Sequence, residues 1–169
     1  MPAMRLFPRR PRHLPLALPR LDGTGWPDPA AVGRPSFDTS TFYELACRNA
    51  YETEAHEVAD RLVGAILPQV PTGVSARDEP YLRKVFHTAA RIGAGLAMVE
   101  RTLPTPDPRS VDRRIAGALW QARRRQPVMS PDWARTAAYF LLAGYYVART
   151  SPEVIPSLVR EVTSPPDPA

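Results

Sequence analysis

Residues 130–150 read SPDWARTAAYFLLAGYYVART, and this stretch decides the fold. In a helix, Trp133, Phe140 and Leu141 share one face while Tyr139 and Val147 occupy others, so apolar groups surround most of the axis. A helix that is apolar on nearly every side must be buried in the core. We therefore expect the other amphipathic helices to form a wall around it.

Three amphipathic helices are predicted before this stretch and one short helix after it. The first begins at the capping-box pattern Thr41-Phe-Tyr-Glu44, where the two side chains would satisfy each other's backbone donors. The predicted main helices cover 41–67, 78–101, 111–125 and 130–150, and the short one lies between 151 and 163. No strand signal competes, so the fold class is all-α: a bundle of four main helices plus a short C-terminal helix.

The second predicted helix carries small residues at four-residue spacing, namely Ala89, Gly93 and Ala97. Glycine inside a helix costs about 1 kcal/mol relative to alanine, so a glycine there indicates a packing reason. The pattern predicts close approach of another helix backbone.

Residues 1–36 form an arm rich in proline and arginine, with eight prolines. Proline at this density excludes a helix, so the arm is expected to be extended, followed by a helical domain at 37–163 and a frayed tail at 164–169. The arm wraps back over its own domain, docks on a partner protein or lies along nucleic-acid phosphates; the sequence leaves these three alternatives open.

The sequence favours a cytoplasmic location and no membrane partner. Proline interrupts every apolar run near the N-terminus, which argues against a secretory signal. The apolar run between Arg135 and Arg149 is shorter than the roughly 20 residues that a bilayer requires. The single cysteine, Cys47, excludes an internal disulfide and fits a reducing compartment.

The strongest interaction signal is the third predicted helix, because residues 109–125 carry six arginines against one aspartate. Clustered guanidinium groups around a flat ring are the combination used in phosphate tracking and base stacking. The candidate contacts are Arg109, Arg113, Arg114, Trp120, Arg123, Arg124 and Arg125, with Arg5, Arg9, Arg10, Arg12 and Arg20 as candidate contacts in the arm. Alternatively, the acidic face of the first helix accepts these arginines, within the bundle or between subunits.

No catalytic set or metal site emerges from the sequence. Glu52, His56 and Asp60 lie at successive four-residue steps, but no facing Glu-x-x-His pattern supplies further ligands, so we predict a solvated or ion-paired face. His87 has arginines at the flanking turns, including Arg91, and is predicted to lie at the core boundary. Phosphate-binding glycine loops and a nucleophile elbow are absent. We expect no cofactor, no metal and no enzyme activity.

The leading hypothesis is a non-enzymatic helical subunit of a larger assembly that contacts nucleic-acid backbone without sequence specificity. Small helical subunits of bacterial ribonucleoprotein complexes, such as CRISPR-type effector complexes, share this make-up, as a likeness of architecture alone. One alternative is a protein-interaction adaptor whose arm docks on a partner protein. Another is a small-molecule-binding helical protein lined by Trp133, Tyr139, Tyr145 and Tyr146.

The tyrosine hydroxyls within residues 130–150 need hydrogen-bond partners, and four main helices cover only part of this helix. We therefore expect the arm or another subunit to cover the remainder, which also allows a homo-oligomer.

Overall fold

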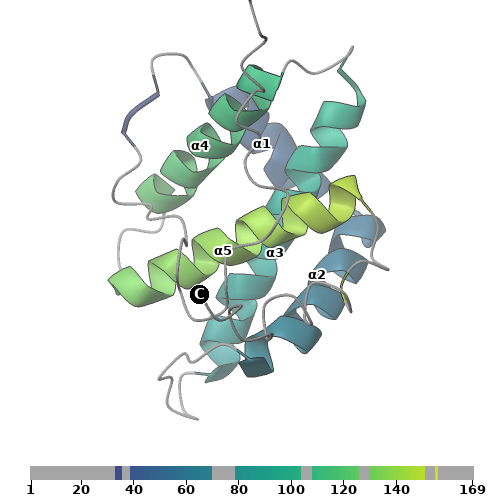
Figure 1. Ribbon diagram of the computed structural model, residues 1–169, viewed down its shortest axis with the longest axis vertical. Helices are drawn as coiled ribbons and strands as arrows, with labels where there is room; N and C mark the ends of the chain where they lie inside the picture. The colour runs from purple at the N-terminus through teal and green to yellow at the C-terminus, as the bar shows by residue number, and fades with distance from the viewer. Residues whose placement is uncertain are drawn as a thin grey trace, which may run out of the picture.

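A computed structural model of the chain describes residues 33–35, 39–69, 79–103, 108–125, 130–150 and 155, with the backbone alone at 69 and 108–112. Its elements are α1 (Ser40–Asn49), α2 (Thr53–Ile66), the 3-10 turn η1 (Leu67–Gln69), α3 (Glu79–Arg101), α4 (Pro108–Arg125) and α5 (Pro131–Arg149) (Figure 1). The predicted all-α bundle is confirmed. In these ranges no helix is both long enough and apolar enough to cross a bilayer.

Three predictions fall largely outside the described residues: the extended arm, the short C-terminal helix and the frayed tail. The described exceptions are residues 33–35 of the arm and Ile155 of the predicted C-terminal helix. The side chain of Ile155 is buried in the core cluster.

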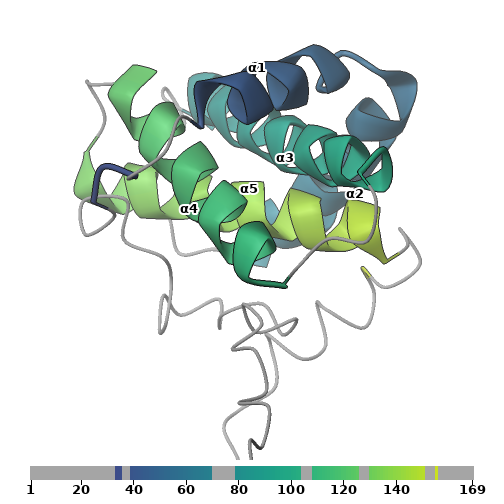
Figure 2. The same ribbon diagram turned by 90° about the horizontal axis from the view of Figure 1, so that it is seen from above.

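The centre of the bundle is the crossing of α3 and α5, where the two backbones come into direct contact. A Cβ atom built on Gly93 would overlap the Leu141 carbonyl group, and one built on Gly144 would overlap the Ala90 carbonyl group. On the opposite side of α3, Gly95 meets the backbone of α1 in the same way. Figure 2 shows α3 lying between α1 and α5. The predicted close approach is confirmed, and α3 has neighbours on more sides than α5 does.

The predicted burial of α5 is also largely confirmed. Its first turn is capped by Ser130, whose hydroxyl accepts the backbone N–H of Trp133 at 3.3 Å. Phe140 is fully buried, and its ring stacks on that of Phe86 with 5.3 Å between centroids. Tyr139 and Tyr145 are covered by the chain's own helices, although Trp133 and Tyr146 remain half-buried.

The predicted single helix over 41–67 is wrong, because the chain turns at Ala50–Glu52 and forms two helices. The predicted capping box is also wrong. α1 follows Thr39 without a side-chain cap bond, and the Glu44 carboxylate lies 3.5 Å from Arg125 of α4 instead. A long-range contact bridges the break, since Arg91 of α3 donates to the Ala50 carbonyl oxygen at 3.4 Å. Leu45 of α1 is exposed.

A buried charged network joins α3, α4 and α5. Arg114 Nε donates to Glu100 Oε1 at 3.1 Å, and the two side chains are only 7% and 6% exposed. The Tyr145 hydroxyl donates to the second oxygen of Glu100 and accepts from Arg149 Nη1 at 3.0 Å. Burial, together with the bond to Glu100, raises the pKa of Tyr145, so its hydroxyl stays a donor at neutral pH. The network therefore fixes α4 against α3 and α5.

A second ion pair, between Arg101 and Glu54, ties the end of α3 to the start of α2. Two guanidinium nitrogens donate to the two carboxylate oxygens at 3.0 and 2.7 Å. Arg101 also donates to the Ala148 carbonyl oxygen at 2.6 Å, near the end of α5. The hydrogen bond from Arg101 lowers the pKa of Glu54.

This pair predicts a pH-dependent contribution to stability. A carboxyl whose pKa is lowered by folding stabilises the folded state above its unfolded pKa, and the contribution is lost as pH falls through the folded pKa. Both side chains are nearly half exposed, so we expect about 1 kcal/mol at most. Urea denaturation should show the wild type more stable than Glu54→Gln at neutral pH, with the difference shrinking as the pH falls below about 4.3, the usual pKa of an unfolded glutamate. A difference that stays constant as the pH falls would contradict the prediction.

Candidate functional site

The residues of the predicted basic site on α4 differ in how far their side chains are buried. Its exposed members are Arg113, Arg123, Arg124 and Arg125, whereas Trp120 is half-buried and Arg114 is buried. The predicted outward orientation of Arg114 is wrong, because the side chain turns inward to pair with Glu100. The side chain of Arg109 and the five arginines proposed as contacts in the arm lie outside the described residues.

Arg113, Trp120 and Arg124 share one face of α4. Their separations of seven and eleven residues are close to two and three full helical turns. At 1.5 Å of rise per residue, Arg113 and Arg124 stand about 16 Å apart along the axis, with Trp120 between them. The Arg124 guanidinium lies 5.5 Å from the centroid of the Trp120 ring. We call these three residues, with the neighbouring exposed Arg123, the α4 stripe.

The adjacent face of α4 packs against α1. Arg125 lies 3.5 Å from Glu44 and 4.9 Å from the centroid of the Tyr43 ring. Gln121 is buried and donates to Thr39 Oγ1 at 3.4 Å. Arg125 therefore pairs with Glu44, an acidic residue of the first predicted helix. For this residue, the structure agrees with the alternative in which the arginines contact acidic side chains within the bundle. This contact separates Arg125 from the α4 stripe.

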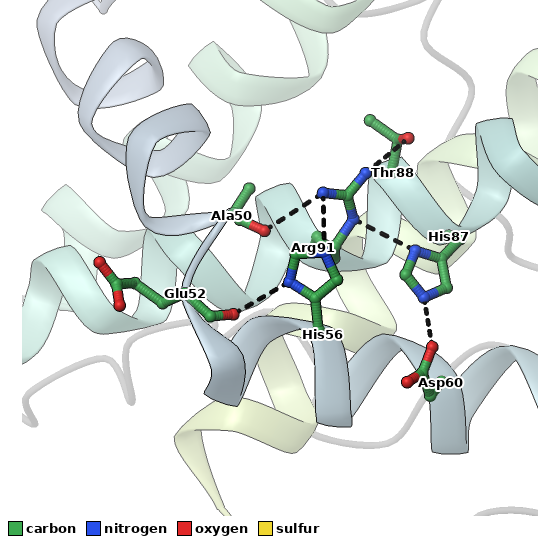
Figure 3. Close-up of polar contacts among 7 residues, drawn as sticks. All are labelled: Ala50, Glu52, His56, Asp60, His87, Thr88 and Arg91. Carbon is green, nitrogen blue, oxygen red and sulfur yellow. Dashed lines mark hydrogen bonds and ion pairs between the residues drawn. The ribbon is translucent and has the colours of Figure 1, made fainter.

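A second polar cluster lies where α1 and α2 meet α3, centred on the side chain of Arg91 (Figure 3). His56 of α2 and His87 of α3 have ring centroids 6.0 Å apart. The Arg91 guanidinium contacts both rings: its Nε donates to His87 Nδ1 at 3.1 Å, and its Nη1 lies 3.4 Å from His56 Nε2. We call His56, Asp60, His87 and Arg91 the Arg91 cluster.

The hydrogen bonds assign the proton positions in the two rings. Arginine has only donors, so each ring nitrogen that it contacts must be an acceptor. His87 therefore carries its proton on Nε2, which lies 2.6 Å from Asp60 Oδ1. His56 carries its proton on Nδ1, 3.1 Å from the Glu52 carbonyl oxygen. In this assignment each ring has one N–H group and one acceptor nitrogen.

This arrangement limits the chemistry of the Arg91 cluster. The Asp60–His87 pair has the short contact expected of an oriented general base, yet the second ring nitrogen is taken up by Arg91. Among the described residues, no group of three or more His, Cys, Asp or Glu side chains is placed to hold a metal ion. The sequence predicted that Glu52, His56 and Asp60 share one face, but it did not predict that Arg91 would contact both histidine rings. The local signal for this contact is the four-residue spacing of His87 and Arg91.

No protein-family model, curated protein or solved structure matches the chain. Two candidate sites thus come from the geometry of the described residues. The α4 stripe presents exposed cationic groups beside an aromatic ring. The Arg91 cluster directs its donors and acceptors toward one another and joins three helices.

Proposed function

We propose that the α4 stripe binds the backbone of single-stranded nucleic acid without sequence specificity, as part of a larger assembly. The observation that supports this proposal is the placement of Arg113, Trp120 and Arg124 on one face of α4, where both arginines are exposed and Trp120 is half-buried. Proteins that track single strands combine guanidinium groups along the backbone with an aromatic ring on which bases stack. A stripe of about 16 Å is long enough to meet several successive phosphates.

The composition of the α4 stripe favours backbone contacts over base reading. Contacts from arginine to phosphate position a nucleic acid but carry no sequence information. The following helix, α5, is mostly buried and offers few polar side chains to base edges, unlike the recognition helix of a helix-turn-helix protein.

The distribution of exposed charge also favours α4 over α2 as the binding face. The exposed acids of α2 and its N-cap include Glu52, Glu57 and Asp60. A polyanion would be repelled by this surface and attracted to α4.

The alternatives have less support in the described residues. The adaptor hypothesis depends on the arm, which lies mostly outside them. Two of the four residues proposed to line a small-molecule site, Tyr139 and Tyr145, are buried in the core.

Replacement of the stripe arginines tests the proposal. The variant carries Arg113→Gln, Arg123→Gln and Arg124→Gln, and binding to fluorescent oligothymidine and oligouridine is measured by anisotropy at low salt. We expect the dissociation constant to rise at least about tenfold, which is about 1.4 kcal/mol.

A matched control removes the same charge elsewhere on the surface. Arg61→Gln, Arg83→Gln and Lys84→Gln replace three exposed residues of α2 and α3 and lower the net charge equally. We expect this control to weaken binding by less than about threefold, since only long-range attraction changes. Equal weakening by the two triple variants, or no binding by the wild type, would reject α4 as the site.

A further inference from the structure

We propose that the Arg91 cluster is a pH-sensitive device, which holds the junction between α1 and α2 at neutral pH and releases it when a histidine ring is protonated. The inference does not depend on the proposed function, because it concerns only contacts among α1, α2 and α3.

Arg91 joins the three helices through most of its donors. Besides the two rings, it donates from Nη1 to the Ala50 carbonyl oxygen at 3.4 Å and from Nη2 to Thr88 Oγ1 at 3.2 Å. It also lies 5.9 Å from the centroid of the Tyr51 ring, within the turn between α1 and α2. A single guanidinium thus fixes the turn and the first part of α2 to α3 (Figure 3).

A second proton on either ring is incompatible with these contacts. The ring nitrogens that carry no proton, and would receive one, are Nδ1 of His87 and Nε2 of His56. These are the two atoms that face Arg91. Protonation would set an N–H group against an N–H group and place two cations side by side. The protonated ring and Arg91 must therefore separate.

Other charged groups make the protonated arrangement accessible without unfolding. On α2 and its N-cap, Asp60 contacts His87, and Glu52 and Glu57 lie within one turn of His56. On α3, Arg83 and Lys84 lie within one turn of His87 and oppose protonation, as Arg91 does. Tyr51 lies in the turn itself, Arg48 lies near the end of α1, and Glu54 of α2 is paired with Arg101.

Asp60 can hold a protonated His87 as an ion pair after Arg91 leaves. Ala46, Ala55 and Val58, which are buried side chains of α1 and α2, carry no titratable group. Acidification therefore exchanges one set of contacts for another at the junction and leaves the bundle folded.

Hydrogen exchange of the junction amides tests this inference. The N–H groups of Tyr51, Glu52 and His56 are bonded to carbonyl oxygens of Arg48, Asn49 and Glu52, so they are protected when the junction is closed. Exchange is followed by mass spectrometry on the whole chain and normalised for the intrinsic effect of pH. Between about pH 7.5 and pH 5, we expect junction protection to fall about tenfold while the α3–α5 crossing near Gly93 is unchanged.

A double variant that cannot titrate supplies the control. His56→Gln places an amide oxygen where Nε2 accepts, and His87→Asn places one where Nδ1 accepts, so Arg91 keeps both partners. We expect its junction protection to vary less than about twofold over the same pH range. An equal fall in both proteins, or no fall in the wild type, would overturn the inference. Imidazole nitrogen shifts of the wild type at pH 7.5 give a second check, since tautomers other than Nε2–H for His87 and Nδ1–H for His56 would also overturn it.

Discussion

Replacing Gly93 by alanine is expected to lower the free energy of unfolding by about 3 kcal/mol, although alanine is the better helix former. The added methyl group would enter the space occupied by the Leu141 carbonyl group and would also crowd the Tyr145 backbone nitrogen. Neither group can move as a flexible side chain would, so α3 and α5 must separate along their crossing. The measurement is urea denaturation followed by far-ultraviolet circular dichroism.

Gly64→Ala is the control for this substitution. Gly64 lies on the exposed side of α2, and a Cβ built there meets nothing within 4 Å. We expect this variant to be more stable than the wild type by about 0.5–1 kcal/mol, because only helix propensity changes. If Gly93→Ala were neutral or stabilising like Gly64→Ala, the close crossing of α3 and α5 would be wrong.

Glu100→Gln is expected to cost about 3 kcal/mol, because it removes the buried carboxylate that faces the Arg114 guanidinium. The substitution keeps the size of the side chain, so little of the loss comes from a cavity. It also removes a charged acceptor from the Tyr145 hydroxyl. The loss should appear in urea denaturation and should be accompanied by faster hydrogen exchange in α4.

Glu79→Gln provides the comparison on the surface. Glu79 lies 3.7 Å from Arg83, and both side chains are at least half exposed. Exposed pairs of this kind contribute between about 0 and 0.5 kcal/mol when both members lie on one helix. A similar small effect of Glu100→Gln would show that the buried network does not hold α4 in place.

The sequence predicted those parts of the fold that depend on local pattern. The Ser130 cap and the apolar residues of α5 act within one helix, so helix and burial follow from them. The close packing at Gly93 could also be predicted, because a glycine inside a helix lowers helix stability and packing must compensate for that loss. The sequence did not predict that α3 lies between α1 and α5. The partner of Gly95 is the backbone of α1, and no spacing rule identifies which helix a glycine will contact.

Long-range contacts explain the features that the sequence did not predict. The break between α1 and α2 is held by Arg91, 41 positions from Ala50 in the chain. Arg114 was predicted to be exposed because it belongs to a cluster of arginines, and charged side chains are normally exposed. Its burial depends on Glu100, which lies on the preceding helix and which no local rule pairs with residue 114.

The two candidate sites differ in the same way. Arg113, Trp120 and Arg124 share a face by helical periodicity alone, so this part of the predicted site was readable in the sequence. The Arg91 cluster gathers side chains from α2 and α3 that meet only after folding. Its histidines and Arg91 were visible in the sequence, but the contact between Arg91 and His56 of another helix was not.

The salt dependence of binding to oligothymidine tests the proposed function of the α4 stripe most directly. Three guanidinium groups on a single strand should give a slope of about −2 for the logarithm of the association constant against the logarithm of salt concentration. The slope should approach zero in the variant with Arg113→Gln, Arg123→Gln and Arg124→Gln. The same slope in wild type and variant, or no binding by the wild type at low salt, would contradict the proposal.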